Sequence, residues 1–154
     1  MNEGKKFEED FKRSVPPDFF YYRFRDNAAS FSGGDSTRFT SHNICDCEIM
    51  AKDKLYLLEL KSHKGSSIPI NCIRKNQVEG LVDAAQYDNV YSMFIINFRD
   101  KQRTFVISAI LINEFIESTD KKSIPVSFFE QYGMEIRTEK KISRYKYDLN
   151  FMRR

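Results

Sequence analysis

Charged side chains interrupt two apolar runs near the middle of the chain, and three of them could take part in chemistry. Asp46 lies in the first run, residues 44–51, and Glu59 and Lys61 lie in the second, residues 54–61. Burying a carboxylate is costly unless a cation or a hydrogen bond compensates it. Because side chains alternate across a strand, Glu59 and Lys61 should project from one face, and Asp46 joins them if the two runs pair as a hairpin.

Two carboxylates and an ammonium group at one end of a sheet can support hydrolysis of a phosphodiester. Mg²⁺ prefers oxygen ligands and takes one or two carboxylates together with waters and substrate phosphate. A bound metal lowers the pKa of its water and polarises the phosphate, and Lys61 can orient the water or balance developing charge. The bare pattern, Asp46 and then Glu59-Leu60-Lys61, also fits an ordinary surface ion pair, so it does not by itself decide between the two.

The surrounding residues predict a mixed sheet flanked by helices. The first helix ends before Pro16-Pro17, and Ser108 is the expected N-cap of a later one. The run 90–98 is almost continuously apolar, as in a central strand covered on both faces. The expected helices are 4–14, 74–87, 109–118 and a short one ending at Gly133, and the expected strands are 19–25, 44–51, 54–61, 90–98, 103–108 and a late one from Met134.

Length and composition are those of one globular domain over residues 1–154. The chain is 41% hydrophobic and 31% charged, and no apolar run reaches the roughly 18 residues of a membrane span. The first 13 residues are charged and unlike a signal peptide, which favours a cytoplasmic location without a membrane partner. Three cysteines in such a chain are expected to be free thiols.

Two segments are candidates for contact with nucleic acid. Residues 26–43 are rich in Ser, Gly, Asn and Asp and are expected to form an exposed arm. Residues 137–154 carry seven Lys or Arg against two Asp or Glu, a net charge of +5, which fits either a solvated end or a strip that contacts phosphates. The candidate DNA-binding residues are Arg25, Phe31, Arg38, Phe39, Lys64, Lys140 and Lys141.

Other polar residues near the strand pair have simpler interpretations. Glu48 is either a further metal ligand or, as we favour, a charged residue at the solvent-exposed edge of its strand. Cys45 and Cys47 are expected to face the core, away from Asp46. With His42 and Cys72 they form no Cys-x₂-Cys pair, so a zinc site is disfavoured.

The order of these motifs resembles the PD-(D/E)xK nuclease superfamily and, within it, the RecU family of Holliday junction resolvases. The similar stretches are the opening GKKFEED, the interval from Asp46 to Glu59, ELK, SSIPINCIRKNQVEGL and FIINF followed by TFVISAILINEF. The resemblance covers most of the chain. It implies a restriction-endonuclease-like αβββαβ core with the arm between the first two strands, in a compact variant like those of phages or prophages.

The resemblance also implies roles for individual residues. Asp46, Glu59 and the carbonyl of Leu60 would bind Mg²⁺ or Mn²⁺, and Lys61 would assist the attacking water. Gln77 would help to hold the metal or water, and Glu8 would be an additional acidic partner. The implied protein is a homodimer that cuts four-way DNA by paired symmetric incisions during recombination and repair.

Two other functions fit the same residues. One is a general restriction-type or repair-type nuclease acting on duplex or flap DNA. The other is a catalytically inert protein that binds branched DNA. The intact Asp46, Glu59 and Lys61 argue against the inert protein, because stability alone would favour apolar residues at these positions.

Overall fold

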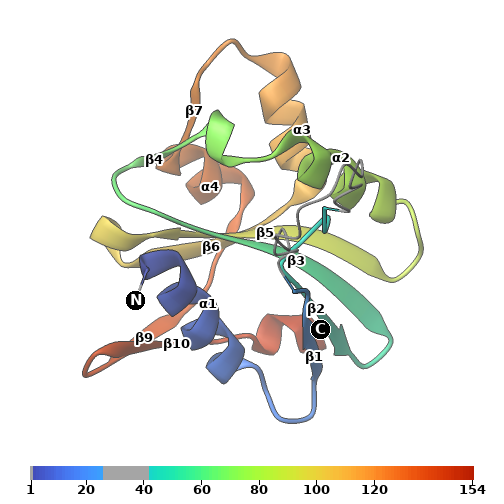
Figure 1. Cartoon of the computed structure of the whole chain (residues 1–154), viewed down its shortest axis with the longest axis vertical. Helices are drawn as coiled ribbons and strands as arrows, with labels where there is room; N and C mark the ends of the chain where they lie inside the picture. Colours follow the sequence, from blue (N-terminus) through green and yellow to red (C-terminus); the bar gives the residue numbers. More distant parts are fainter. Residues whose placement is uncertain (1, 26–41) are drawn as a thin grey trace, which may run out of the picture.

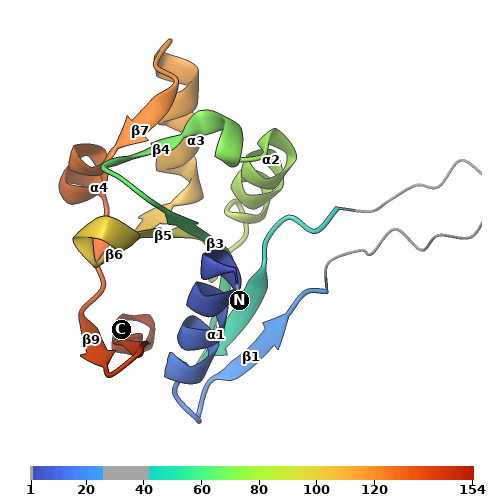
Figure 2. The ribbon, with the colours of Figure 1, turned by 60° about the vertical axis from the view of Figure 1, so that its left-hand side comes forward.

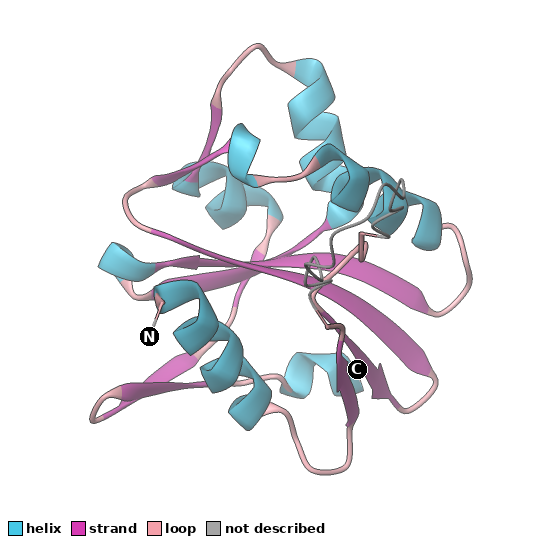
Figure 3. Cartoon of the chain, in the orientation of Figure 1, coloured by secondary structure: helices cyan, strands magenta, loops and turns pink. Residues whose placement is uncertain are grey.

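A six-stranded mixed sheet forms the centre of the computed structural model, which describes residues 2–25 and 42–154 (Figures 1 and 3). The strands run in the order β1-β2-β3-β5-β6-β8, and only β3 and β5 pair in parallel. The bounds are β1 Phe20–Arg23, β2 Cys47–Ala51, β3 Lys54–His63, β5 Val90–Phe98, β6 Arg103–Ser108 and β8 Met134–Glu135. The predicted mixed α/β class is confirmed.

The apolar sequences of β3 and β5 explain their central position. Both strands are buried on both faces over most of their length, as expected for parallel neighbours covered by helices on either side. The run 90–98 was predicted with the bounds that β5 has. Glu59 and Lys61 on β3 therefore lie in the centre of the sheet.

One face of the sheet packs against helix α1 (Glu3–Ser14) and the C-terminal segment (Figure 1). Phe7 and Phe11 enter this half of the core, as the spacing of apolar residues predicts. The opposite face packs against three helices. These are α2 (Lys75–Ala84), α3 (Ala109–Ser118) and α4 (Val126–Tyr132).

The basic C-terminal segment is folded rather than a free tail. Strands β9 (Thr138–Lys141) and β10 (Arg144–Tyr147) form a hairpin, and the 3₁₀ helix η3 (Asn150–Arg153) follows it. Tyr147, Leu149 and Met152 are buried in the same half of the core as α1. The sequence analysis considered only the charged residues of this segment and did not use these apolar ones.

Smaller differences from the sequence-based expectations occur at the ends of elements. Strand 44–51 begins only at Cys47, because residues 44–46 form a bend. A second short pair, β4 (Ser67–Pro69) with β7 (Ser123–Pro125), was not predicted. The turn helices η1 (Ile70–Cys72) and η2 (Arg99–Lys101) complete the described elements. No helix in the described ranges is both long and apolar enough to cross a membrane.

Candidate active site

Asp46 is held at the point where β2 joins the sheet. Its N–H donates to the Leu58 carbonyl at 3.0 Å, and its own carbonyl accepts from Phe24 N at 2.9 Å. The pairing of Cys47 with Leu58 places Asp46 across from Glu59. Asp46 Oδ2 accepts a hydrogen bond from the Leu60 amide at 2.7 Å, so the carboxylate is turned to the open edge of β3.

The bend before β2 breaks the expected alternation of side chains. Cys45 and Cys47 are both buried, as predicted, but they lie in different halves of the core rather than on one face. A regular strand would have placed them together. Because the chain bends here, Asp46 can bond the backbone of β3 instead of standing on the face of the sheet.

Glu59 is a fully buried carboxylate with few compensating contacts. Lys61 Nζ lies 2.6 Å from its Oε1. Among the described residues, only this ammonium and the Gln77 amide compensate the Glu59 carboxylate, and Gln77 Oε1 has no hydrogen-bond partner. Burial and, secondly, the Asp46 carboxylate raise the pKa of Glu59 to about 7, which Lys61 and the Gln77 amide only partly offset. Burial also raises the pKa of Asp46, although the Leu60 N–H opposes this shift.

Helix α2 approaches the site closely enough to bring Gln77 to it. Gly80 makes this possible, because a Cβ there would lie 2.4 Å from Cγ2 of Ile44, two residues before Asp46. Gln77 is buried on the same helix. Figure 2 shows α1 and α2 on opposite sides of β3, so the site receives residues from both helices.

Glu8 of α1 reaches the Asp46 side of the site through an ion pair with Arg23. Arg23 donates from Nε and Nη2 to Glu8 Oε2, at 2.9 and 2.7 Å. The Glu8 charge raises the pKa of Asp46 and the Arg23 charge lowers it. The sequence analysis missed Arg23. The available signal was a cation within the aromatic strand, by the same reasoning that singled out Asp46.

The oxygen atoms gathered here fit a hard divalent cation. The incompletely compensated Glu59 carboxylate and the unpartnered Gln77 Oε1 are groups that such an ion would satisfy. In the described ranges, no three His, Cys, Asp or Glu side chains form a metal-binding group. Asp46 and Glu59 are thus the two carboxylates, and backbone, amide and water oxygens would have to complete the set.

The other predicted residues are scattered. Lys64, Lys140 and Lys141 are exposed on the β3–β4 loop and β9, and Arg25 is exposed after β1. The Arg25 carbonyl accepts from the side chain of Asn43 at 2.7 Å. The flanks of the predicted arm therefore lie side by side next to Asp46. Phe31, Arg38 and Phe39 fall outside the described residues. Glu48 is half-buried between Tyr22 and Leu57.

The mixed sheet and its flanking helices have a restriction-endonuclease-like fold. A solved structure of Hjc, a Holliday junction resolvase from Archaeoglobus fulgidus, matches with a TM-score of 0.50 and 18% identity over 86% of this chain and 92% of that one. This likeness supports the fold. It does not transfer an activity.

The sequence comparisons identify the family to which the chain belongs. Residues 24–149 match the RecU family, recombination protein U. An uncharacterized SPbeta prophage-derived protein of Bacillus subtilis, YotM, is 30% identical over 167 residues, which cover 97% of this chain and 84% of that protein. The chain belongs to the RecU family of Holliday junction resolvases.

Proposed function

We propose that the protein is a metal-dependent endonuclease that cuts four-way DNA junctions by paired, symmetric incisions. One observation carries the proposal. The buried Glu59 carboxylate is compensated only by Lys61 and the Gln77 amide among the described residues, and it lies beside Asp46 at an open strand edge in a chain of this family. A cytoplasmic location belongs to the same proposal, because junction DNA is the substrate.

The proposed roles follow from the contacts. Asp46, Glu59 and the Leu60 carbonyl would hold Mg²⁺ or Mn²⁺, which supplies an acidified water and charge on the scissile phosphate. The Leu60 amide fixes the Asp46 carboxylate. Lys61 is paired with Glu59, and with a cation held by Glu59 its ammonium would be available to orient the attacking water. Gln77 orients water or metal from α2, and the Glu8–Arg23 pair tunes the charge at Asp46.

Asp46→Asn is expected to separate binding from cutting. Cleavage of a four-way junction should fall at least about 1,000-fold, because one of two metal-binding carboxylates is lost. Junction affinity in EDTA should change less than about threefold, since the amide still accepts from Leu60. Gel-shift titration and single-turnover cleavage measure the two quantities.

Asp53→Asn is the matched control for this variant. Asp53 is exposed in the turn of the same hairpin, so its substitution should alter neither quantity. Loss of both binding and cutting in Asp46→Asn would assign Asp46 a structural role. Wild-type binding without any cutting would favour an inert junction-binding protein.

The homodimer in this proposal is supported by an exposed apolar face on the edge strand. Phe20, Tyr22 and Met50 are 59, 47 and 40% exposed. Phe20 and Met50 are directly paired across β1 and β2, and β1 has no further neighbour in the described sheet. Such apolar surface is typical of contacts between subunits.

Met50→Lys is therefore expected to yield a monomer where the wild type is a dimer, without loss of thermal stability. Sedimentation velocity gives the mass of each. Ile142→Lys is the control, because Ile142 is fully exposed in the β9–β10 turn and its replacement should leave the mass unchanged. A dimer that persists in Met50→Lys, or a monomeric wild type, would contradict this part of the proposal.

A further inference from the structure

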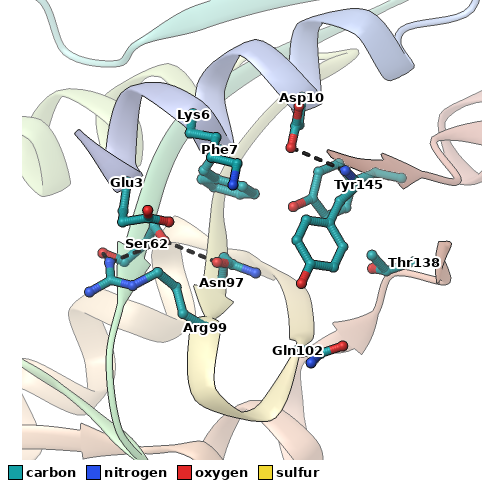
Figure 4. A pocket seen from close by; sticks show the side chains of 11 residues that line it. Glu3, Lys6, Phe7, Asp10, Ser62, Asn97, Arg99, Gln102, Thr138 and Tyr145 are labelled. Atoms are coloured by element: carbon teal, nitrogen blue, oxygen red, sulfur yellow. Dashed lines mark hydrogen bonds between the residues drawn. The ribbon is translucent and has the colours of Figure 1, made fainter. Parts of the chain in front are cut away.

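A cavity of about 190 Å³ lies on the α1 side of the sheet, beside the end of β3 (Figure 4). Lys6 of α1 lies on one wall, and Thr138 and Tyr145 of the C-terminal hairpin lie on another. Arg99 and Gln102 come from the β5–β6 connection. None of these residues takes part in the metal-binding edge described above.

The floor of the cavity is a fixed row of polar side chains. Ser62 Oγ donates to Asn97 Oδ1 at 3.0 Å, and Asn97 Nδ2 donates to Thr104 Oγ1 at 3.0 Å. The row crosses three adjacent strands, because Ser62 pairs with Asn97 and Asn97 with Thr104. Thr104 is completely buried. A polar floor of this kind serves a polar ligand better than an apolar one.

The Arg99 guanidinium lies across this floor, and only some of its N–H donors are used. Its Nη1 donates to the Ser62 carbonyl at 3.0 Å and contacts Ser62 Oγ at 3.4 Å. Its Nε and Nη2 have no hydrogen-bond partner among the described residues. A guanidinium fixed by one nitrogen and open at the others is suited to an anion, and phosphate in particular.

The position of Arg99 connects the cavity with the active site. Alternate residues of a strand present their backbone groups to the same side, so the Ser62 carbonyl lies on the same edge of β3 as the Leu60 amide. Two residues span about 6.6 Å of strand. Phosphates along one DNA strand advance about 3.4 Å per nucleotide, so Arg99 lies one or two nucleotides beyond the metal-binding edge.

We propose that this cavity binds a backbone phosphate of the cleaved strand, one or two nucleotides from the scissile bond. Arg99 makes the direct contact, and Lys6 adds a second positive charge. The inference rests on the proposed function, because it takes the substrate strand to lie along the open edge of β3. It adds a positioning site for that substrate rather than a catalytic residue.

Two carboxylates also line the cavity, and their positions lead to a further expected result. Asp10 is occupied, since it accepts from Arg144 Nη1 and from Tyr145 N, both at 3.1 Å. Glu3 is exposed at the mouth of the cavity, near Arg99 in Figure 4. Glu3→Gln should therefore strengthen junction binding by about twofold, the opposite of what loss of Arg99 does.

The test measures how the loss of single phosphate charges affects DNA binding by the wild type and by an Arg99 variant. Four-way junctions carrying a single methylphosphonate at successive backbone positions around the branch point are titrated in EDTA, with wild type and with Arg99→Gln. For wild type, one position should weaken binding about tenfold. For Arg99→Gln, binding to the unmodified junction should be weaker by the same factor, with no further loss at that position. The salt slope should fall by about one.

The controls separate this inference from general electrostatics and from misfolding. Lys101→Gln removes a charge from the same turn but does not line the cavity, so it should keep the wild-type interference pattern. Lys6→Gln supplies a second variant, with a smaller loss, if Arg99→Gln proves unstable in thermal melts. An interference pattern identical in wild type and both variants would overturn the inference.

Failure of the proposed function would look different. A wild type that binds junctions, shows the Arg99-dependent position and yet cuts nothing in Mg²⁺ would retain the phosphate site and reject the nuclease. A wild type that cuts junctions without any Arg99-dependent position would retain the nuclease and reject the site. Failure of the wild type to bind junction DNA would reject both.

Discussion

Glu59→Gln is expected to abolish junction cleavage and at the same time to stabilise the metal-free protein at pH 8. Cleavage should drop at least about 1,000-fold, because a carboxylate is replaced by a weak neutral ligand. In EDTA, the free energy of unfolding should rise by about 2 kcal/mol, or a Tm increase of roughly 4 to 8 °C. Single-turnover cleavage and thermal melts give the two values.

The stabilising effect follows from the raised pKa of Glu59. Burial, with the neighbouring Asp46, places that pKa at about 7, above its ordinary value of 4.5. The folded protein therefore holds this proton more tightly than the unfolded chain does. Below about pH 4.5 both states are protonated, and as pH rises to 7 the unfolded state ionises first, so folding stability falls. A neutral amide does not ionise, and it can also donate to the unpartnered Oε1 of Gln77.

Three comparisons check this account. The stability gain of Glu59→Gln should disappear near pH 4.5. Addition of Mg²⁺ at pH 8 should raise the Tm of wild type but not of the variant. Glu48→Gln, on the adjacent strand and half-buried, should cut normally and show neither effect. A Glu59→Gln protein that still cuts, or that is less stable than wild type at pH 8, would contradict the metal site.

Asp10→Ala is expected to be the most destabilising single substitution between α1 and the C-terminal hairpin. Asp10 is 1% exposed and joins the Arg144 side chain and the Tyr145 amide to the helix. Its removal leaves the Tyr145 N–H unpaired and the half-buried Arg144 guanidinium with Glu9 as its remaining partner, at a cost of about 2 to 4 kcal/mol. Urea unfolding at pH 7 measures the loss.

Glu9→Ala provides the matched control for this substitution. Glu9 accepts from the same Arg144, at 3.2 Å, but its side chain is 45% exposed. An exposed ion pair contributes about 0 to 1 kcal/mol. Equal effects of the two substitutions would show that the hairpin is not attached through Asp10.

The strand pattern of residues 54–61 was sufficient to predict that Glu59 and Lys61 lie together, whereas the architecture was predicted from the order of elements along the whole chain. Alternation within β3 placed Glu59 and Lys61 together, and the apolar run of β5 placed a partner beside them. Gln77 entered the prediction only through the family resemblance, because helical periodicity says nothing about which strand end it reaches. Gly80 makes that approach possible.

Other features depended on contacts between residues far apart in the sequence. Asp10 meets Arg144 across 134 positions, so the sequence suggested only a basic segment where a packed hairpin exists. Arg99 and Ser62 meet because β3 and β5 pair in register. The bend that turns Asp46 toward Leu60 breaks the two-residue period on which the strand prediction relied.

Mapping of cuts on a four-way junction tests the central claim most directly. Each of the four strands is end-labelled in turn, and the junction, its matched duplex and a flap are incubated with the protein in Mg²⁺ and in EDTA. We predict nicks on two opposing strands at symmetric positions, only in the junction and only with metal. Equal cutting of the duplex or flap, or cutting in EDTA, would contradict the assignment of this site as a metal-dependent junction resolvase.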